Sequence, residues 1–235
     1  MTATATDLVF RPSAERFHSR LDWLNSWHSF SFAGHVDPAW MGFGALRVIN
    51  DDTIAAGSGF GMHPHQDMEI VTVMVEGQLM HRDSMGHSEV LSAGEVQRVS
   101  AGTGVVHSEI NESDQPCRLL QIWIEPSCKG SKPVYEQKRF SIGASWTLLL
   151  DPDQADGAMA IQSQARLWRA QPPAAQSLSL ALASGSRGWI QMIGGSGEAD
   201  GHPLRPGDGL GFGAGTLELF RAGTEGADLL LFELL

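Results

Sequence analysis

The stretch SEVLSAGEVQRVSAGTGVVHSEIN (residues 88–111) shows most directly how this chain folds. It alternates short β-prone runs with glycine turns, which is typical of a β-sandwich or β-barrel. Its last strand carries His107 and Glu109, two residues apart. Because alternate side chains of a strand point to the same face, the imidazole and the carboxylate can reach one point inside a β-structure.

A second pair with the same spacing precedes it. His63 and His65 lie in GMHPHQDMEI (residues 61–70), so one strand can aim two imidazoles at one point. Together with His107 and Glu109 they would supply three nitrogens and one oxygen. Such a set suits one divalent transition metal with open coordination positions. The sequence therefore predicts a metal site.

The rest of the chain is also β-prone, and we predict an all-β protein. Further predicted strands span residues 45–52, 67–76, 78–86, 118–126, 146–150, 165–170, 177–184, 188–195, 216–220 and 228–235. Residues 13–30 have weaker patterning and could hold a short helix. Residues 131–140 are polar, and we interpret them as a linker.

The two halves form a faint repeat. Residues 91–95 (LSAGE) parallel residues 204–208 (LRPGD), each a turn between predicted strands. When the halves are aligned on the glycines of these turns, the ligand positions of the first half fall at or near Ala181, Ala183 and Phe220. The second half therefore keeps the strand pattern but lacks the candidate ligands.

This repeat predicts two tandem domains. Residues 1–140 would form the metal-binding domain, and residues 141–235 a degenerate copy that binds no metal. The chain ends in the apolar run DLLLFELL (residues 228–235), and we expect the second domain to stabilise the first by packing. Each large apolar side chain buried there would contribute ~1.5–3 kcal/mol.

Composition restricts the classes of partner. The formal net charge of −11 disfavours direct binding to nucleic acid or to an anionic membrane, since both require a basic surface. We find no signal peptide and no apolar run near the ~20 residues of a membrane helix, and we expect a cytoplasmic protein. Cys117 and Cys128 are predicted to be reduced thiols.

The motifs around the four candidate ligands resemble the two sequence motifs of the cupin superfamily, and the N-terminal half resembles the pirin family. The resemblance covers residues 14–140 almost without a break. The matching stretches are WLNSWHSFSFA (23–33), MGFGALRVINDD (41–52), HPHQDMEIVT (63–72), HRDSMG (81–86), QRVSAGTGVVHSE (97–109), QIWIEP (121–126) and YEQKRF (135–140).

This resemblance implies two cupin domains, each a jelly-roll β-barrel, of which only the N-terminal one binds metal. The metal would be Fe(II) first, with Ni, Co, Mn, Cu or Zn also compatible, and its ligands would be His63, His65, His107 and Glu109. Motif spacing leaves open whether Glu69 or Glu109 is the carboxylate ligand. Glu109 is favoured, because Glu69 lies about 13 Å along the strand from His65 at ~3.3 Å per residue.

The resemblance also implies an activity. Several pirins are quercetin 2,3-dioxygenases, which cleave a flavonol ring with O₂ and release carbon monoxide. In that reaction Glu109 would act as the general base. The alternative is a non-catalytic, metal-binding regulatory module that works through a protein partner, as eukaryotic pirins do. We expect a monomer in either case.

Other polar and aromatic residues receive structural interpretations. The histidines without a partner at ligand spacing are predicted to be structural or exposed: His28, His35, His81 and His87. Asp67 and Glu69 could either orient the imidazoles or form a solvated strand end. Trp23, Trp27 and Trp40 are predicted to be core residues rather than a platform for substrate.

Overall fold

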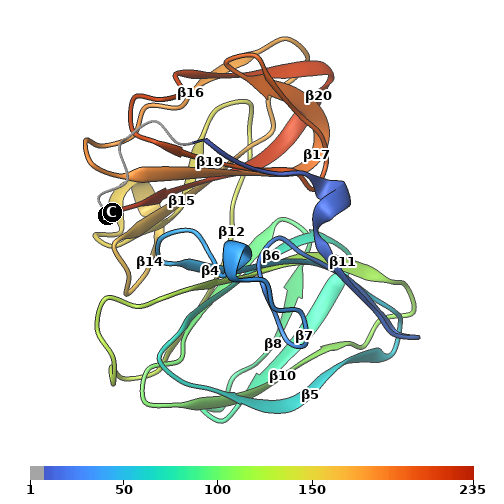
Figure 1. Cartoon of the computed structure of the whole chain (residues 1–235). Coiled ribbons are helices and arrows are strands. Elements are labelled where there is room, and N and C mark those ends of the chain that lie inside the picture. The colour runs from blue at the N-terminus through green and yellow to red at the C-terminus, as the bar shows by residue number, and fades with distance from the viewer. Residues whose placement is uncertain (1–7) are drawn as a thin grey trace. The chain divides into compact units, whose positions relative to one another are not determined.

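A computed structural model describes residues 8–235, and these residues are almost entirely β-strand. They form two compact units (Figure 1). The N-terminal unit comprises residues 17–140 and 161–163, and the C-terminal unit comprises residues 8–16, 141–160 and 164–235. The predicted all-β class is confirmed.

The N-terminal unit consists of two antiparallel sheets. The larger sheet has the strand order β12-β9-β6-β11-β4-β3-β2, and the smaller has the order β5-β10-β7-β8. The strands of the larger sheet are β2 (Phe17–Arg20), β3 (Leu24–His28), β4 (Leu46–Ile54), β6 (Glu69–Glu76), β9 (Glu95–Ser100), β11 (Cys117–Ile124) and β12 (Val134–Arg139). Those of the smaller sheet are β5 (Ser58–His65), β7 (Gln78–Asp83), β8 (Ser88–Ser92) and β10 (Val105–Asn111).

The core of this unit explains the strand patterns. β6 and β11 lie side by side in the middle of the larger sheet and read as almost continuous apolar runs. A cluster of buried side chains packs beneath them: Leu24, Ile54, Met74, Leu79, Leu91, Cys117 and Leu119. Burial of each large side chain contributes ~1.5–3 kcal/mol, so this cluster anchors the strands that carry the site.

The C-terminal unit is built on one nine-stranded sheet, with the main order β1-β19-β17-β20-β15-β13-β14. Its strands are β1 (Val9–Arg11), β13 (Thr147–Asp151), β14 (Met159–Ala160), β15 (Ala165–Ala170), β16 (Ser177–Ser179), β17 (Arg187–Ala199), β18 (His202–Leu204), β19 (Gly209–Gly213) and β20 (Leu219–Leu234). Its core is apolar, and Phe212 and Phe220 are both fully buried there.

The turns on which the two halves align are equivalent in the structure. Gly94 lies between β8 and β9, and Gly207 between β18 and β19. Their φ angles are 83° and 85°, a conformation that favours glycine. Phe220, which aligns with His107, is the second residue of β20 and is buried in the apolar core. An apolar ring thus occupies the position at which the N-terminal unit has an imidazole.

Several local predictions are corrected. Residues 13–30 hold only a 3₁₀ turn (η1, Ser13–Glu15) before β2 and β3, so the predicted helix is wrong. Residues 131–140 are not a free linker, because β12 pairs with β9. Residues 219–220 and 228–234 of the last two predicted strands belong to the single long strand β20, whereas residues 216–218 precede it.

The domain division is also less simple than one cut after residue 140. β1 pairs with β19, with Val9 opposite Gly211, so residues 8–16 belong to the C-terminal unit. Residues 161–163, by contrast, belong to the N-terminal unit. The chain therefore crosses between the units more often than the division into residues 1–140 and 141–235 implies.

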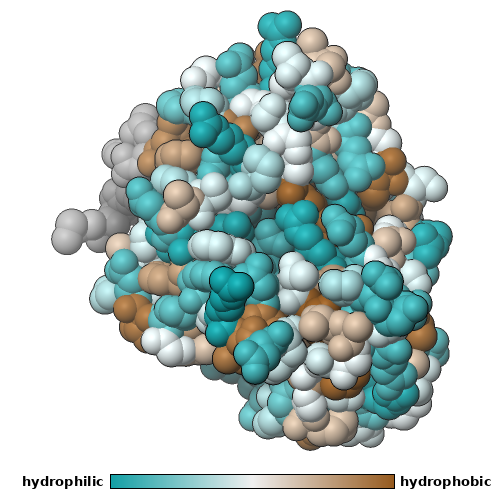
Figure 2. Space-filling model, turned by 90° about the vertical axis from the view of Figure 1, so that its right-hand side faces the viewer, coloured by the Kyte–Doolittle hydropathy of each residue, from teal (hydrophilic) through white to brown (hydrophobic). Residues whose placement is uncertain are grey.

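Surface features agree with the composition. On the face shown in Figure 2, hydrophilic side chains are interspersed with small hydrophobic patches. Cys117 and Cys128 are both free, the first buried and the second exposed. Within residues 8–235, no helix has the length and apolar character needed to cross a membrane.

Candidate metal centre

Three histidines converge at one point in the N-terminal unit. His63 and His65 come from β5, and His107 from the neighbouring strand β10, where it lies directly opposite His63. The ring centroids are 4.5 Å apart for His63 and His107, and 4.8 Å apart for each pair that includes His65. One nitrogen from each ring lies within 4.8 Å of the others, so the three could bind one ion.

His107 shows the clearest fit to a metal. Its side chain is 1% exposed, and neither ring nitrogen has a hydrogen-bond partner among residues 8–235. A buried polar atom without a partner is costly and calls for an explanation. A metal ion bound to one of these nitrogens would supply the explanation. The two neighbouring imidazoles could bind the same ion.

The pKa values of two of these imidazoles favour the form that binds metal. Burial, reinforced by the neighbouring imidazoles of His107 and His63, lowers the pKa of His65 to about 4. Burial, followed by the imidazoles of His63 and His81, lowers the pKa of His107 to about 3. Both rings are therefore neutral at pH 7, as metal ligation requires.

A register shift between β5 and β10 brings Glu109 to the same cavity wall as His63 and His65. His107 pairs with His63, but Glu109 pairs with Phe60, so β5 contains one extra residue between these two pairings. Such a bulge bends its strand and re-aims the adjacent side chains. Glu109 lines the same cavity as His63 and His65.

Glu109 is buried and held by two neighbours. The Gln121 amide donates to both carboxylate oxygens, at 3.1 Å and 2.9 Å. The hydroxyl of Thr72 donates to Gln121 Oε1 at 3.1 Å, which fixes the amide with its NH₂ group toward Glu109. The carboxylate is therefore oriented before any ligand binds.

The other carboxylates considered from the sequence are engaged elsewhere. Glu69 Oε2 accepts hydrogen bonds from Ser100 Oγ at 2.8 Å and from the Gln162 backbone N–H at 3.1 Å. Asp67 Oδ1 accepts from the Gly130 backbone N–H at 2.7 Å. These contacts favour Glu109 over Glu69 as the carboxylate of the centre.

A cavity of about 350 Å³ opens beside the histidines. Its apolar wall includes Leu21, Leu24, Phe32, Phe60 and Trp123, and its polar wall includes Ser19, Ser26, His28, Asn50, Asp52 and Gln121. Cavities of this size and mixed lining typically bind small molecules. The Trp123 ring stands edge-on to His65, with centroids 5.0 Å apart.

The cavity lining shows what the sequence interpretation missed. His28 is buried and lines the cavity, where its Nδ1 lies 2.8 Å from Asn50 Oδ1. Trp123 lines it as well, whereas Trp23 packs against Phe60 and the core. Neither His28 nor Trp123 has a distinctive spacing, because both reach the cavity through pairing of distant strands.

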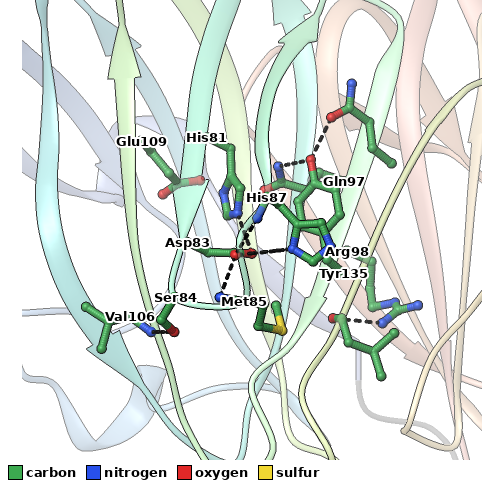
Figure 3. A network of polar contacts seen from close by, with 12 residues as sticks. His81, Asp83, Ser84, Met85, His87, Gln97, Arg98, Val106, Glu109 and Tyr135 are labelled. Carbon is green, nitrogen blue, oxygen red and sulfur yellow. Dashed lines mark hydrogen bonds and ion pairs between the residues drawn. The ribbon is translucent and has the colours of Figure 1, made fainter.

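A second polar cluster lies behind His107 and was not predicted. Figure 3 shows Asp83 between His81 and His87, with Tyr135 beside the two imidazoles. Asp83 Oδ2 is 3.1 Å from His81 Nε2 and 2.9 Å from His87 Nδ1. Tyr135, from β12, stacks on His87 with centroids 4.4 Å apart. The only local signal was the spacing of two between His81 and Asp83.

The cluster keeps Asp83 ionised although its side chain is fully buried. Burial raises the pKa of Asp83, but hydrogen bonds from His81 and from both the backbone and the ring of His87 outweigh that effect. The net result is a pKa below the ordinary value for an aspartate. Asp83 is therefore a hydrogen-bond acceptor at neutral pH.

The chain is similar to proteins of a known family. Residues 10–124 match the family model described as Pirin, and residues 148–234 match the one described as Quercetinase C-terminal cupin domain. A quercetin 2,3-dioxygenase of Escherichia coli (strain K12) is 46% identical over 204 residues, which cover 86% of this chain and 88% of that protein. The chain belongs to the pirin family. The predicted resemblance and the fold of two cupin domains are confirmed.

Two further comparisons concern this pirin's fold and its histidine cluster. The crystal structure of the bacterial pirin YhhW from Escherichia coli in complex with nickel(II) has a TM-score of 0.93 and 42% identity, and covers 97% of this chain and 99% of that chain. A pirin-like protein of Caulobacter vibrioides is 40% identical, covering 80% of this chain and 83% of that protein. A relative therefore binds a metal, and this pirin has a histidine cluster that could hold one.

Proposed function

We propose that the N-terminal unit is a metal-dependent dioxygenase that opens the ring of a quercetin-like flavonol with O₂. One divalent transition metal, with Fe(II) as the first choice, would be held by His63, His65, His107 and Glu109. The observation that carries this proposal is the convergence of three imidazoles beside a cavity of about 350 Å³. The activity in the name of the Escherichia coli relative supports the substrate class.

The metal and the residues of this chain would have separate roles in the reaction. When bound, the metal would supply Lewis acidity, which lowers the pKa of a substrate hydroxyl. Glu109, oriented by Gln121, would accept the proton of that hydroxyl as general base. Phe60 and Trp123 would pack against the aromatic rings of the flavonol and exclude water.

The decisive experiment combines metal analysis with turnover. The purified protein is reconstituted separately with Fe(II), Ni(II), Co(II), Mn(II) and Cu(II), and the loss of quercetin absorbance in air is followed. We expect one metal per chain and turnover that disappears in His63→Ala. His202→Ala, which changes an exposed histidine of the C-terminal unit, is the matched control and should keep both.

The outcomes separate the candidate functions. Quercetin loss no faster than in His63→Ala with every metal would exclude the dioxygenase. Metal binding without turnover would favour the regulatory alternative, in which the metal supports binding of a protein partner. A second ion that is lost in His202→Ala would show that the C-terminal unit also binds metal.

A further inference from the structure

In the polar cluster behind His107, the rings of His81 and His107 are neighbours, and both carry buried nitrogen atoms without a hydrogen-bond partner among the described residues. The centroids of His81 and His107 are 5.3 Å apart at an interplanar angle of 65°. Both side chains are at most 1% exposed. In the part of the chain that the structure describes, neither His81 Nδ1 nor the two nitrogens of His107 have a hydrogen-bond partner.

The hydrogen-bonding character of these atoms is complementary. An ionised carboxylate only accepts hydrogen bonds, so His81 Nε2 donates to Asp83 Oδ2 at 3.1 Å. In the neutral form of His81 the proton is then on Nε2, and Nδ1 is an acceptor. If one nitrogen of neutral His107 binds a metal, the other carries the proton and is a donor. The cluster therefore holds a buried acceptor beside a buried donor.

We infer that His81 is a positioning residue for the metal ligand His107. Asp83 sets the tautomer of His81, and that tautomer can accept a hydrogen bond from His107. This inference rests on the metal site proposed above. Histidine ligands commonly donate their second N–H to such an acceptor, which fixes the ring and increases its basicity. His87 and Tyr135 support Asp83 from the other side. His87 Nδ1 is hydrogen-bonded to Asp83, and the His87 ring stacks on Tyr135.

Asp83→Asn replaces the carboxylate by an amide of almost the same shape. The substitution thereby reverses the direction of the hydrogen bond between residue 83 and His81. The Oδ1 atom of Asp83 accepts the backbone N–H groups of Met85 at 2.8 Å and His87 at 3.1 Å. The amide oxygen of an asparagine would keep these two bonds, which places its NH₂ group where Oδ2 now faces His81 Nε2 and His87 Nδ1. His81 would then have to accept at Nε2 and carry its proton on Nδ1. In that tautomer it cannot accept from His107.

Zinc is the probe, because it is diamagnetic and binds imidazole. Zinc affinity is measured by competition with a chromophoric chelator in the whole protein, for wild type, Asp83→Asn and Glu112→Gln. Glu112→Gln makes the same change from carboxylate to amide at an exposed residue that pairs with Arg82. We expect Asp83→Asn to weaken zinc binding by ~10–100-fold and Glu112→Gln to leave it within about twofold.

The tautomer of His81 gives a readout that a purely structural role would not change. Long-range ¹H–¹⁵N correlation of the imidazoles in zinc-loaded wild type should show the His81 proton on Nε2. In Asp83→Asn it should move to Nδ1. A wild-type His81 protonated on Nδ1, or equal zinc affinity in Asp83→Asn and Glu112→Gln, would overturn the inference alone. Wild-type protein that takes up no zinc would overturn the proposed metal site, and this inference with it.

Discussion

Gln121 donates its side-chain amide to both carboxylate oxygens of Glu109, at 3.1 Å and 2.9 Å. The two residues come from adjacent parts of the sequence but from different sheets, since Gln121 lies on β11 and Glu109 on β10. The contact holds the proposed general base against the cavity wall. Its removal should therefore affect stability even without a metal.

Gln121→Met should lower the free energy of unfolding of the metal-free protein by about 1.5–3 kcal/mol. The substitution keeps the approximate volume of the side chain but leaves the buried carboxylate of Glu109 without its amide donor. Urea denaturation at pH 7 measures the effect. Gln115→Met, at an exposed position, is the control and should change stability by less than about 0.5 kcal/mol. Equal effects in both variants would argue that the contact contributes nothing.

Asp52 should make the metal-free protein less stable as pH rises. Burial raises the pKa of Asp52 to about 7, against the lowering effect of its hydrogen bond from Ser26 and with further raising by Asp51 and Glu109. In the unfolded chain that pKa is about 3.9. The folded state therefore binds more protons between about pH 4 and pH 7. The stabilising contribution of Asp52, up to ~4 kcal/mol, is lost as the pH rises across that window.

Asp52→Asn should remove this dependence, because the amide does not titrate. Urea denaturation at pH 5 and pH 8 should show a smaller loss of stability in the variant than in wild type. Asp22→Asn, at an exposed position, serves as the control and should follow wild type. A variant that loses as much stability as wild type between the two pH values would contradict the assignment to Asp52.

The histidine cluster should have the opposite effect on the pH dependence of stability, and should make the metal-free protein less stable as pH falls. The folded pKa values of about 4 for His65 and about 3 for His107 lie below the unfolded value of about 6.5. The unfolded chain therefore binds more protons below about pH 6.5, and stability is lost as pH falls through the folded pKa values. His107→Phe should flatten this acid limb in the metal-free protein. An unchanged slope in urea titrations between pH 4 and pH 6.5 would show that His107 does not titrate as argued.

Phe220→Ala tests the role of the apolar ring at the position that aligns with His107. Phe220 is fully buried in the C-terminal core, so its truncation should cost about 3–5 kcal/mol through lost burial and a cavity. Thermal denaturation should show the loss, while the folded variant keeps the metal content of wild type. Leu219→Ala, at the exposed neighbouring residue, is the control. A folded Phe220→Ala protein that loses its metal would show that the C-terminal unit contributes to the site.

Much of the site followed from local patterns in the sequence. The spacing of two between His63 and His65 places both rings on one side of β5, because successive residues of a strand alternate between its faces. The same rule connects His107 with Glu109. This period depends only on backbone geometry, so it predicts which side chains share a face of a strand but not which strands pair. The apolar runs of β6 and β11 likewise predicted buried strands in the interior of a sheet.

Other features depended on which strands meet. His81 was predicted to be structural or exposed, although Asp83 lies two residues away, the same spacing as in the ligand pairs. His107 lies opposite Asp83 only through the register of β7 and β10, and Tyr135 reaches the cluster on β12, which was predicted to be a linker. Register and pairing arise from the total packing of the sheets, which no local window contains.

The sequence by itself therefore predicted many of the strands, the two-unit repeat and the faces on which the ligand candidates lie, since these follow from a period of two residues and from burial. Only the tertiary structure decided that Glu109 is held by Gln121, that Glu69 is engaged elsewhere, and that His81 stands behind His107. Each of these relationships joins different strands. Their geometry is set by register, by the bulge in β5 and by the packing of side chains across the core.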